Sequence, residues 1–189
     1  MPLLHLSLKG VSKITTEINA GLIELVTDDG LTQLSIVCEG AMTLQIALRL
    51  AKFPLHGKLL PEVMWRAFGE GWKMSLNVWF ADFIDGEYIV YLRNEQTKQS
   101  WPIRASDAVL FSLVADVPIF AEQSLVEDYG APVDKTGKGT AMPLKLLPTE
   151  MLRRTLQEAI DREEYELASQ LNDELKKRES REQGNRLFT

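Results

Sequence analysis

Apolar and polar residues alternate along several short segments in the first two thirds of the chain, which is typical of strands that bury one face. Residues 4–8 follow this pattern with leucine at every second position, and His5 falls on the opposite face, where we expect exposure to solvent. Two apolar runs, 22–27 and 31–37, flank Asp28-Asp29-Gly30. Because glycine adopts a positive φ without strain, this arrangement predicts a β-hairpin. We therefore interpret the two aspartates as turn residues rather than metal ligands.

The clearest hairpin is predicted for residues 75–82 and 87–94, which are joined through Asp85-Gly86. Both segments are largely apolar at odd and at even positions. Strands with two apolar faces belong inside a layered or barrel-like body, since a one-sided sheet leaves one face to water. Residues 94–100 are polar and predict a turn, after which 101–104 are expected to return to the core.

Apolar residues at helical spacing lie between these strands. Residues 40–52 show the spacing through Leu44 and Leu48, which are therefore expected on the buried face. A second helix is expected over 61–68, because its proline suits a first helical turn. Residues 1–130 thus predict an α+β domain with flanking helices and a mixed, barrel-like sheet of about seven strands.

A strand end meets a helix start near Arg104. Ser106 follows an apolar strand and precedes helical spacing, so we interpret it as the N-cap of a third helix. Asp107 then falls in the first turn, where a negative charge meets the positive end of the helix dipole. Pro118 ends this helix before a strand-like segment, 119–121. Arg104 and Asp107 are either a structural ion pair or the oriented cation and carboxylate of a site.

Residues 131–148 differ in composition from those before them, with prolines, glycines and few large apolar side chains, which predicts a linker. From residue 149 the apolar spacing is purely helical. Two apolar stripes separated by a turn at 162–164 predict a helical hairpin over 149–183, and 184–189 form a tail. Two short helices are marginal in water, so we expect this hairpin to pack on its own domain, in a dimer or on a partner.

Composition and charge restrict the class of protein. With 189 residues, of which 45% are hydrophobic and 25% charged, the chain matches a globular protein of one domain plus an appendage. No apolar run approaches a membrane span and no secretory signal is visible, so we expect a cytoplasmic protein without membrane contact. Cys38 is the only cysteine, and its apolar surroundings predict a small core side chain. The net charge of −6 counts modestly against stable binding of nucleic-acid phosphates.

Cleavage of a phosphodiester needs a general base or a metal-bound water, together with a group that stabilises charge on phosphorus. The candidate carboxylates are Asp82, Asp107, Glu39 and Glu62, and Arg104 is the candidate electrophilic group. Asp82 lies at a strand end on the same hairpin as Asp85, and a structural role explains it better than a catalytic one. A metal-bound water would call for a divalent ion such as Mg²⁺ or Mn²⁺, whose ligands the sequence leaves open. The two histidines form no zinc-ligand pattern.

The segment Arg104-Ala105-Ser106-Asp107-Ala108, followed by Val117-Pro118-Ile119-Phe120, resembles the closing signature of the bifunctional nuclease domain family. Asp82-x-x-Asp85-Gly86 also matches, and the resemblance extends over about residues 4–130. It implies a mixed sheet that curls into a barrel, and a nuclease that acts on DNA or RNA. Where the family often has Leu-Thr-His-Asp before its second helix, this chain has Leu59-Leu60-Pro61-Glu62. If the lost polar groups serve chemistry in the family, this member is weakened or inactive.

The segment from Ala159 to Ala168, followed by Leu171-Asn172-Asp173-Glu174-Leu175, resembles the UVR motif, the helical hairpin shared by the excision-repair proteins UvrB and UvrC. The usual arginine before the aspartate is Asn172 here. The resemblance implies protein–protein contact, often of one hairpin with another, and is compatible with a homo-oligomer. The candidate partner-binding residues are Leu156, Ile160, Tyr165, Ala168, Leu171 and Leu175.

The leading hypothesis is a nuclease that hydrolyses phosphodiester bonds and recruits a protein partner through its UVR hairpin. The alternative is a non-catalytic adaptor or scaffold that uses the nuclease-like fold and is linked to repair or proteostasis machinery. A third hypothesis, binding of a small molecule in the mouth of the barrel, would need a sizeable apolar pocket with converging polar groups.

Overall fold

The computed structural model describes residues 2–13, 20–54, 56–69, 71, 75–133 and 144–186. The chain divides into two compact units. The larger unit consists of Met1–Phe83 and Tyr88–Gly139, and the smaller of Ile84–Glu87 and Thr140–Thr189. The boundary between Gly139 and Thr140 falls inside the predicted linker, most of which (134–143) lies outside the described residues.

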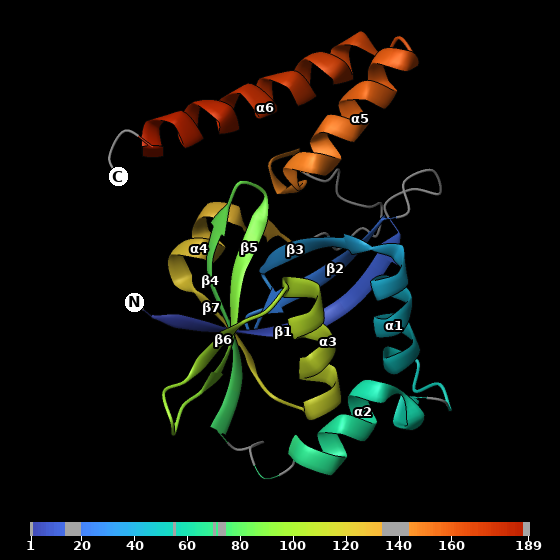
Figure 1. Ribbon diagram of the computed structural model, residues 1–189, viewed down its shortest axis with the longest axis vertical. Coiled ribbons are helices and arrows are strands. Elements are labelled where there is room, and N and C mark those ends of the chain that lie inside the picture. Colours follow the sequence, from blue (N-terminus) through green and yellow to red (C-terminus); the bar gives the residue numbers. More distant parts are fainter. Residues whose placement is uncertain are drawn as a thin grey trace. The chain divides into compact units, whose positions relative to one another are not determined.

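Eight strands form one mixed sheet in the order β6-β5-β4-β7-β1-β2-β3-β8 (Figure 1). Their bounds are β1 Leu3–Lys13, β2 Ala20–Thr27, β3 Thr32–Glu39, β4 Leu76–Ile84, β5 Glu87–Asn94, β6 Ser100–Pro102, β7 Ile119–Glu122 and β8 Ala131–Pro132. β1 pairs antiparallel with β2 and β7, whereas β4 and β7 are parallel. The predicted α+β class and the mixed sheet are therefore confirmed.

The sheet is not closed into a barrel in the described part of the chain, because β6 and β8 form its two edges. β6 pairs with β5 and all three of its residues are exposed. Trp101 retains 38% of its accessible surface. The expectation that residues 101–104 return to the core is therefore wrong, because β6 is an edge strand that pairs with a neighbour on one side only among the described strands.

The turn at Asp28-Asp29-Gly30 is confirmed as a hairpin connection between β2 and β3. Gly30 has a φ of 66°, and Asp29 Oδ1 accepts hydrogen bonds from Thr27 Oγ1 at 2.6 Å and from the backbone N–H of Leu31 at 2.9 Å. The bond from Thr27, followed by that from Leu31, lowers the pKa of Asp29. The aspartate thus acts by holding the turn.

Four helices of the larger unit are α1 Gly40–Leu50, α2 Leu60–Met64, α3 Ala105–Ala115 and α4 Gln123–Tyr129. α2 continues as a π-helical turn, Trp65–Gly69. α1, α2 and α3 lie side by side, and α1 also packs on β1 and β2 (Figure 1). The predicted face of α1 is wrong: Leu44 is 59% exposed, while Thr43, Ile46 and Arg49 are buried.

The predicted N-cap of α3 is also displaced. The helix begins at Ala105, and Arg104 is its N-cap, with extended φ and ψ of −64° and 142°. Ser106 therefore lies in the first helical turn rather than before it. The helix ends at Ala115, where Asp116 adopts a left-handed conformation with a φ of 52° and breaks the helix before Pro118.

The least exposed side chains of the larger unit come from both strands and helices. They include residues 23, 25, 34, 78 and 80 of the strands and residues 46 and 109 of the helices. Cys38 is buried among them, as its sequence surroundings predict. The core therefore lies between the sheet and the helices α1 and α3.

The C-terminal helical hairpin is confirmed. It consists of α5 (Thr149–Asp161) and α6 (Tyr165–Arg186), with a 3₁₀ turn (Leu144–Leu146) before it. The connection at 162–164 contains Glu163 in a left-handed conformation with a φ of 58°. None of the helices in the described residues is long and apolar enough to cross a membrane.

Arg178 of α6 ties together the parts of the smaller unit. Its Nη1 donates hydrogen bonds to the backbone carbonyl oxygens of Leu147 at 2.8 Å and of Asp85 at 3.1 Å. The same nitrogen lies 3.1 Å from Thr149 Oγ1, and Nε donates to Glu174 Oε1 at 3.2 Å. The side chain is buried. The turn between β4 and β5, which the sequence places in the first domain, is thereby held by α6.

Candidate functional site

Arg104 and Asp107, the two residues singled out at the junction of strand and helix, are in contact. Arg104 Nε donates a hydrogen bond to Asp107 Oδ2 at 2.7 Å. Arg104 Nη1 also lies 3.7 Å from Glu39 Oε1. The side chains of Arg104 and Glu39 are 64% and 75% exposed, and that of Asp107 is 36% exposed. The three charged groups form an accessible cluster, which we call the Arg104 cluster.

This cluster joins the N-terminal ends of two helices. Glu39 is the N-cap of α1 and Arg104 is the N-cap of α3, and α1 and α3 are neighbours. Neither N-cap residue makes a side-chain cap hydrogen bond within the described part of the chain. The first backbone N–H groups of both helices are thus not capped by these two side chains, and each helix end carries a partial positive charge. Helix ends of this kind attract phosphate and other anions.

The Arg104 guanidinium is held in its charged form. Its hydrogen bond with Asp107, followed by the charge of Asp107, raises the pKa of Arg104 above its usual value. Asp107 also fixes the direction of the guanidinium, because the Nε bond lies in the guanidinium plane. The remaining N–H donors of Arg104 can then contact two oxygens of one phosphate, which suits the planar guanidinium group.

Cys38 lies next to the Arg104 cluster in sequence but is not a nucleophile. Burial raises the pKa of the Cys38 thiol, and a hydrogen bond with Thr43 acts in the opposite direction. The Sγ atom lies 3.4 Å from Thr43 Oγ1. Because the thiolate is the reactive form, this thiol is unreactive in the folded chain.

Asp82 takes no part in the Arg104 cluster. It is exposed at the end of β4, and its Oδ1 accepts a hydrogen bond at 2.8 Å from the backbone N–H of the next residue, Phe83. This local bond stabilises the strand end. Among the described residues, the structure brings Arg104, Asp107 and Glu39 together and leaves Asp82 outside.

Glu62 has a structural partner. Arg49 Nη2 donates a hydrogen bond to Glu62 Oε2 at 2.9 Å, and Arg49 Nε lies 2.8 Å from Glu62 Oε1. The second contact is electrostatic, because the Nε–H is not aligned with that oxygen. The two side chains are only 4% and 12% exposed. Glu62 therefore joins α2 to α1, and removal of either partner would leave a charge that is buried and uncompensated.

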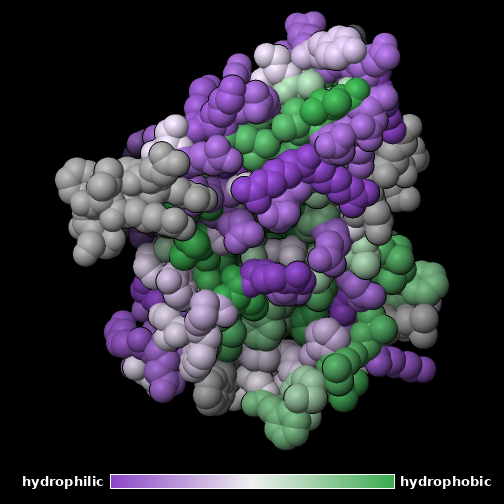
Figure 2. All heavy atoms as spheres, turned by 45° about the horizontal axis from the view of Figure 1, so that its top comes forward, coloured by the Kyte–Doolittle hydropathy of each residue, from purple (hydrophilic) through white to green (hydrophobic). Residues whose placement is uncertain are grey.

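The six candidate partner-binding residues of the hairpin divide into two groups. Ala168, Leu171 and Leu175 are buried, and Leu156 is half-buried. Ile160 and Tyr165 remain 48% and 69% exposed. Figure 2 shows apolar side chains between charged ones on the C-terminal helices. The buried residues hold α5 against α6, and Ile160 and Tyr165, on either side of the turn, are the ones accessible to a partner.

A second apolar surface was not expected from the sequence. Figure 2 shows hydrophobic residues gathered over α1 and α2 at the lower right. The exposed members are Leu44, Leu50, Phe53, Leu60, Val63, Met64 and Phe68, of which Leu60 and Phe68 retain 72% and 75% of their surface. Contiguous exposed apolar surface of this kind often marks an interaction site.

Among the described residues, no group of three or more histidine, cysteine, aspartate or glutamate side chains is placed to hold a metal ion. The Arg104 cluster offers two carboxylates, Glu39 and Asp107, which could bind Mg²⁺ or Mn²⁺ only together with oxygens of a substrate phosphate. In comparisons with known proteins, no family model matches the chain and no curated protein matches it.

Proposed function

We propose that the chain is a nuclease of the bifunctional nuclease type, which hydrolyses phosphodiester bonds of DNA or RNA at the Arg104 cluster. The supporting observation is the placement of an exposed, oriented guanidinium at the N-terminus of α3 and close to Glu39, the N-cap of α1. Positive groups of this kind are the ones that stabilise the charge that develops on a phosphate in the transition state. We place the protein in the cytoplasm, where a sole cysteine remains reduced.

Each residue of the cluster has a distinct role in this proposal. Arg104 binds a non-bridging phosphate oxygen and stabilises the charge that develops on it. Asp107 is a positioning residue, since its 2.7 Å bond directs the guanidinium. Glu39 is the most exposed carboxylate of the cluster and accepts a proton from the attacking water as the water oxygen bonds to phosphorus. The P–O bond to the leaving nucleotide oxygen breaks in the same displacement, and that oxygen takes a proton from solvent. A Mg²⁺ or Mn²⁺ ion that arrived with the substrate would be held by Glu39 and would make that water more acidic.

The test is cleavage of labelled single- and double-stranded DNA and RNA, with Mg²⁺, Mn²⁺ or EDTA. Arg104→Ala is expected to lower the rate roughly 100-fold or more, as removal of one such charge-stabilising group does in other enzymes. Arg153→Ala is the matched control, because Arg153 also forms an exposed i,i+3 ion pair, 2.9 Å from Glu150. Equal activity in wild type and Arg104→Ala would show that the Arg104 cluster does not carry the reaction.

A non-catalytic adaptor or scaffold, linked to repair or proteostasis machinery, is the second candidate. It is favoured by the exposed apolar residues on α2, above all Leu60 and Phe68, and by the net charge of −6. Folded wild-type protein that cleaves none of the four substrates would favour this function over the nuclease.

In both cases we propose that the hairpin binds a protein partner, or a second copy of the chain, through Ile160 and Tyr165. Ile160→Glu is expected to abolish self-association or partner capture by adding a charge to the exposed apolar surface. Leu31→Glu is a matched control, since Leu31 is an exposed leucine in the larger unit. Sedimentation of the two variants and the wild type measures the effect, and equal behaviour of all three would contradict the role of Ile160 in self-association.

A further inference from the structure

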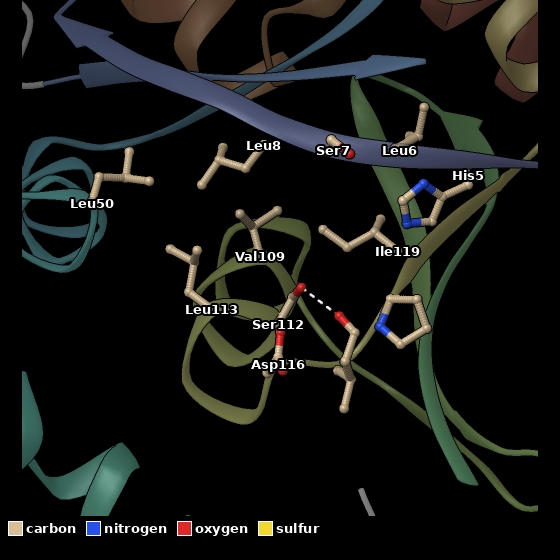
Figure 3. A pocket seen from close by; sticks show the side chains of 12 residues that line it. His5, Leu6, Ser7, Leu8, Leu50, Val109, Ser112, Leu113, Asp116 and Ile119 are labelled. Atoms are coloured by element: carbon tan, nitrogen blue, oxygen red, sulfur yellow. Dashed lines mark hydrogen bonds between the residues drawn. The ribbon is translucent and has the colours of Figure 1, made fainter. Parts of the chain in front are cut away.

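A pocket of about 460 Å³ opens in the larger unit between β1 and the C-terminal half of α3 (Figure 3). Aliphatic side chains from four elements or their ends line part of it, beside the polar side chains of His5, Ser7, Ser112 and Asp116. The aliphatic side chains include Leu8 of β1, Leu50 of α1, Val109 and Leu113 of α3, and Ile119 of β7. The volume lies in the range of sites that enclose a small ligand, and such sites combine apolar walls with a few placed polar groups.

His5 supplies the most distinctive polar group of this pocket. Its Nδ1 lies 2.7 Å from Asp28 Oδ1. An ionised carboxylate only accepts hydrogen bonds, so Nδ1 carries the hydrogen, and in the neutral ring Nε2 has a free lone pair. The edge of the imidazole meets the ring of Phe120, with 5.5 Å between the centroids. Figure 3 shows the His5 ring pointing into the pocket. Asp28 and Phe120 thus hold the His5 ring so that Nε2 can accept a hydrogen bond from a ligand in the pocket.

Three other polar side chains line the pocket: Ser112, Asp116 and Ser7, whose hydroxyl can donate as well as accept a hydrogen bond. Ser112 Oγ donates its hydrogen to the backbone carbonyl oxygen of Val117 at 2.7 Å. Its oxygen keeps only acceptor capacity toward a ligand. Asp116 brings a carboxylate to the rim and Asp28 a second one behind His5. A ligand with an N–H or O–H donor is complementary to the acceptors of His5 and Ser112.

We propose that this pocket binds a small, mostly apolar molecule, such as a heteroaromatic compound, that donates one N–H or O–H hydrogen bond to His5 Nε2. The aliphatic walls enclose the apolar body of the ligand, and His5 selects for the donor. The site is separate from the Arg104 cluster in residues and in chemistry, because that cluster suits an anion. Its ligand is therefore not the phosphate of a nucleic acid.

Indole and 1-methylindole form a matched pair of probes, since they share an apolar bicyclic body and only indole has the N–H donor. Binding to the full-length protein is followed by NMR through the methyl signals of Leu8, Leu50 and Leu113. We expect indole to shift these signals and to bind about three- to tenfold more tightly than 1-methylindole, as one net hydrogen bond provides. His5→Phe keeps a ring in place and is expected to remove this difference.

Two further variants separate the role of His5 from a general loss of structure. Asp28→Asn retains an oxygen that accepts from Nδ1–H and is expected to keep the preference for indole. Leu113→Trp fills the pocket and is expected to abolish binding of both probes in a protein whose other NMR signals are unchanged. The inference is overturned if indole shifts no pocket signal in the folded wild type, or if wild type and His5→Phe bind both probes equally.

Discussion

Gly30 and Gly86, each preceded by an aspartate in a hairpin turn, give a matched test of how tightly the smaller unit is packed. Gly30 and Gly86 both have a positive φ, 66° and 87°. A Cβ added at Gly30 would meet nothing within 4 Å among the described atoms. At Gly86 it would lie 2.5 Å from the backbone carbonyl oxygen of Leu147 and even closer to Arg178 Nη1. Both substitutions therefore place alanine at a positive φ, but only Gly86→Ala also brings a Cβ too close to neighbouring atoms.

The shared penalty is the left-handed backbone, which is unfavourable for alanine by about 1–2 kcal/mol. Gly86→Ala adds overpacking, which typically destabilises by about 1–3 kcal/mol. The backbone of Leu147 cannot rotate away as a side chain would, and movement of Arg178 would weaken its bonds to Leu147 and Asp85, each worth about 1 kcal/mol. We therefore expect a loss of about 1–2 kcal/mol for Gly30→Ala and about 2–5 kcal/mol for Gly86→Ala.

Urea denaturation of both variants measures these losses, and hydrogen exchange of backbone amides locates them. Faster exchange in α6 is expected for Gly86→Ala and not for Gly30→Ala, because Gly86 contacts residues of the smaller unit. Arg178→Met combined with Gly86→Ala completes a double-mutant cycle, in which a positive coupling energy is expected. Equal losses in the two glycine variants would refute the packing of Arg178 and Leu147 around Gly86.

Three further predictions concern ionisable groups. Burial raises the pKa of Tyr88, whose hydroxyl donates to the Ser35 carbonyl oxygen at 3.1 Å. Because the unfolded chain loses this proton near pH 10 and the folded chain does not, stability should fall above about pH 10, less so in Tyr88→Phe. A hydrogen bond from Asn77 lowers the pKa of Glu95, and Lys98 and Arg93 beside Glu95 act in the same direction. Because the folded chain holds this carboxylate ionised at lower pH than the unfolded chain does, the wild type should lose stability as the pH falls below about 4.5, and Glu95→Gln should lose less. Either prediction would be contradicted if the free energy of unfolding of the variant varied with pH as steeply as that of the wild type. Iodoacetamide should alkylate Cys38 only in urea, and fast reaction of the native protein would contradict its burial.

The hairpin turns were predictable because their signal is local. Asp28-Asp29-Gly30 and Asp85-Gly86 each combine a residue that tolerates a turn with a glycine that adopts positive φ, and both glycines do so. The C-terminal hairpin was predictable for the same reason, since each helix carries its own apolar stripe. The alternation of leucines in residues 4–8 likewise identified β1.

The buried face of α1 was predicted wrongly because an arginine occupies it. Helical spacing assigned Leu44 and Leu48 to the interior, whereas the chain buries Arg49 and compensates its charge with Glu62. The two residues are thirteen positions apart in sequence, and only the fold brings them together. A charged residue on an otherwise apolar helix is the signal that could have prompted a search for its partner.

His5 was expected to face solvent because alternation places it opposite the leucines of β1. The alternation was correct, since Leu6 is buried and His5 is not. The opposite face is nevertheless not simply solvent, because Asp28 and Phe120 approach His5 from two other segments of the sheet. Contacts across twenty-three positions of sequence leave no periodic signal, so the pocket could not be read from the chain.

The net charge of −6 was weighed against a nuclease, but a sum over the whole chain does not decide which ligand one site binds. Fields near a site depend on the groups within about 10 Å, because salt screens more distant ones. Around Arg104 those groups include a guanidinium and the N-terminal ends of two helices, set against two carboxylates. Around His5 they include the carboxylates of Asp28 and Asp116. The net charge therefore decides neither the proposed binding of a phosphate at the Arg104 cluster nor the proposed binding of a hydrogen-bond donor at His5, and each proposal requires its own test.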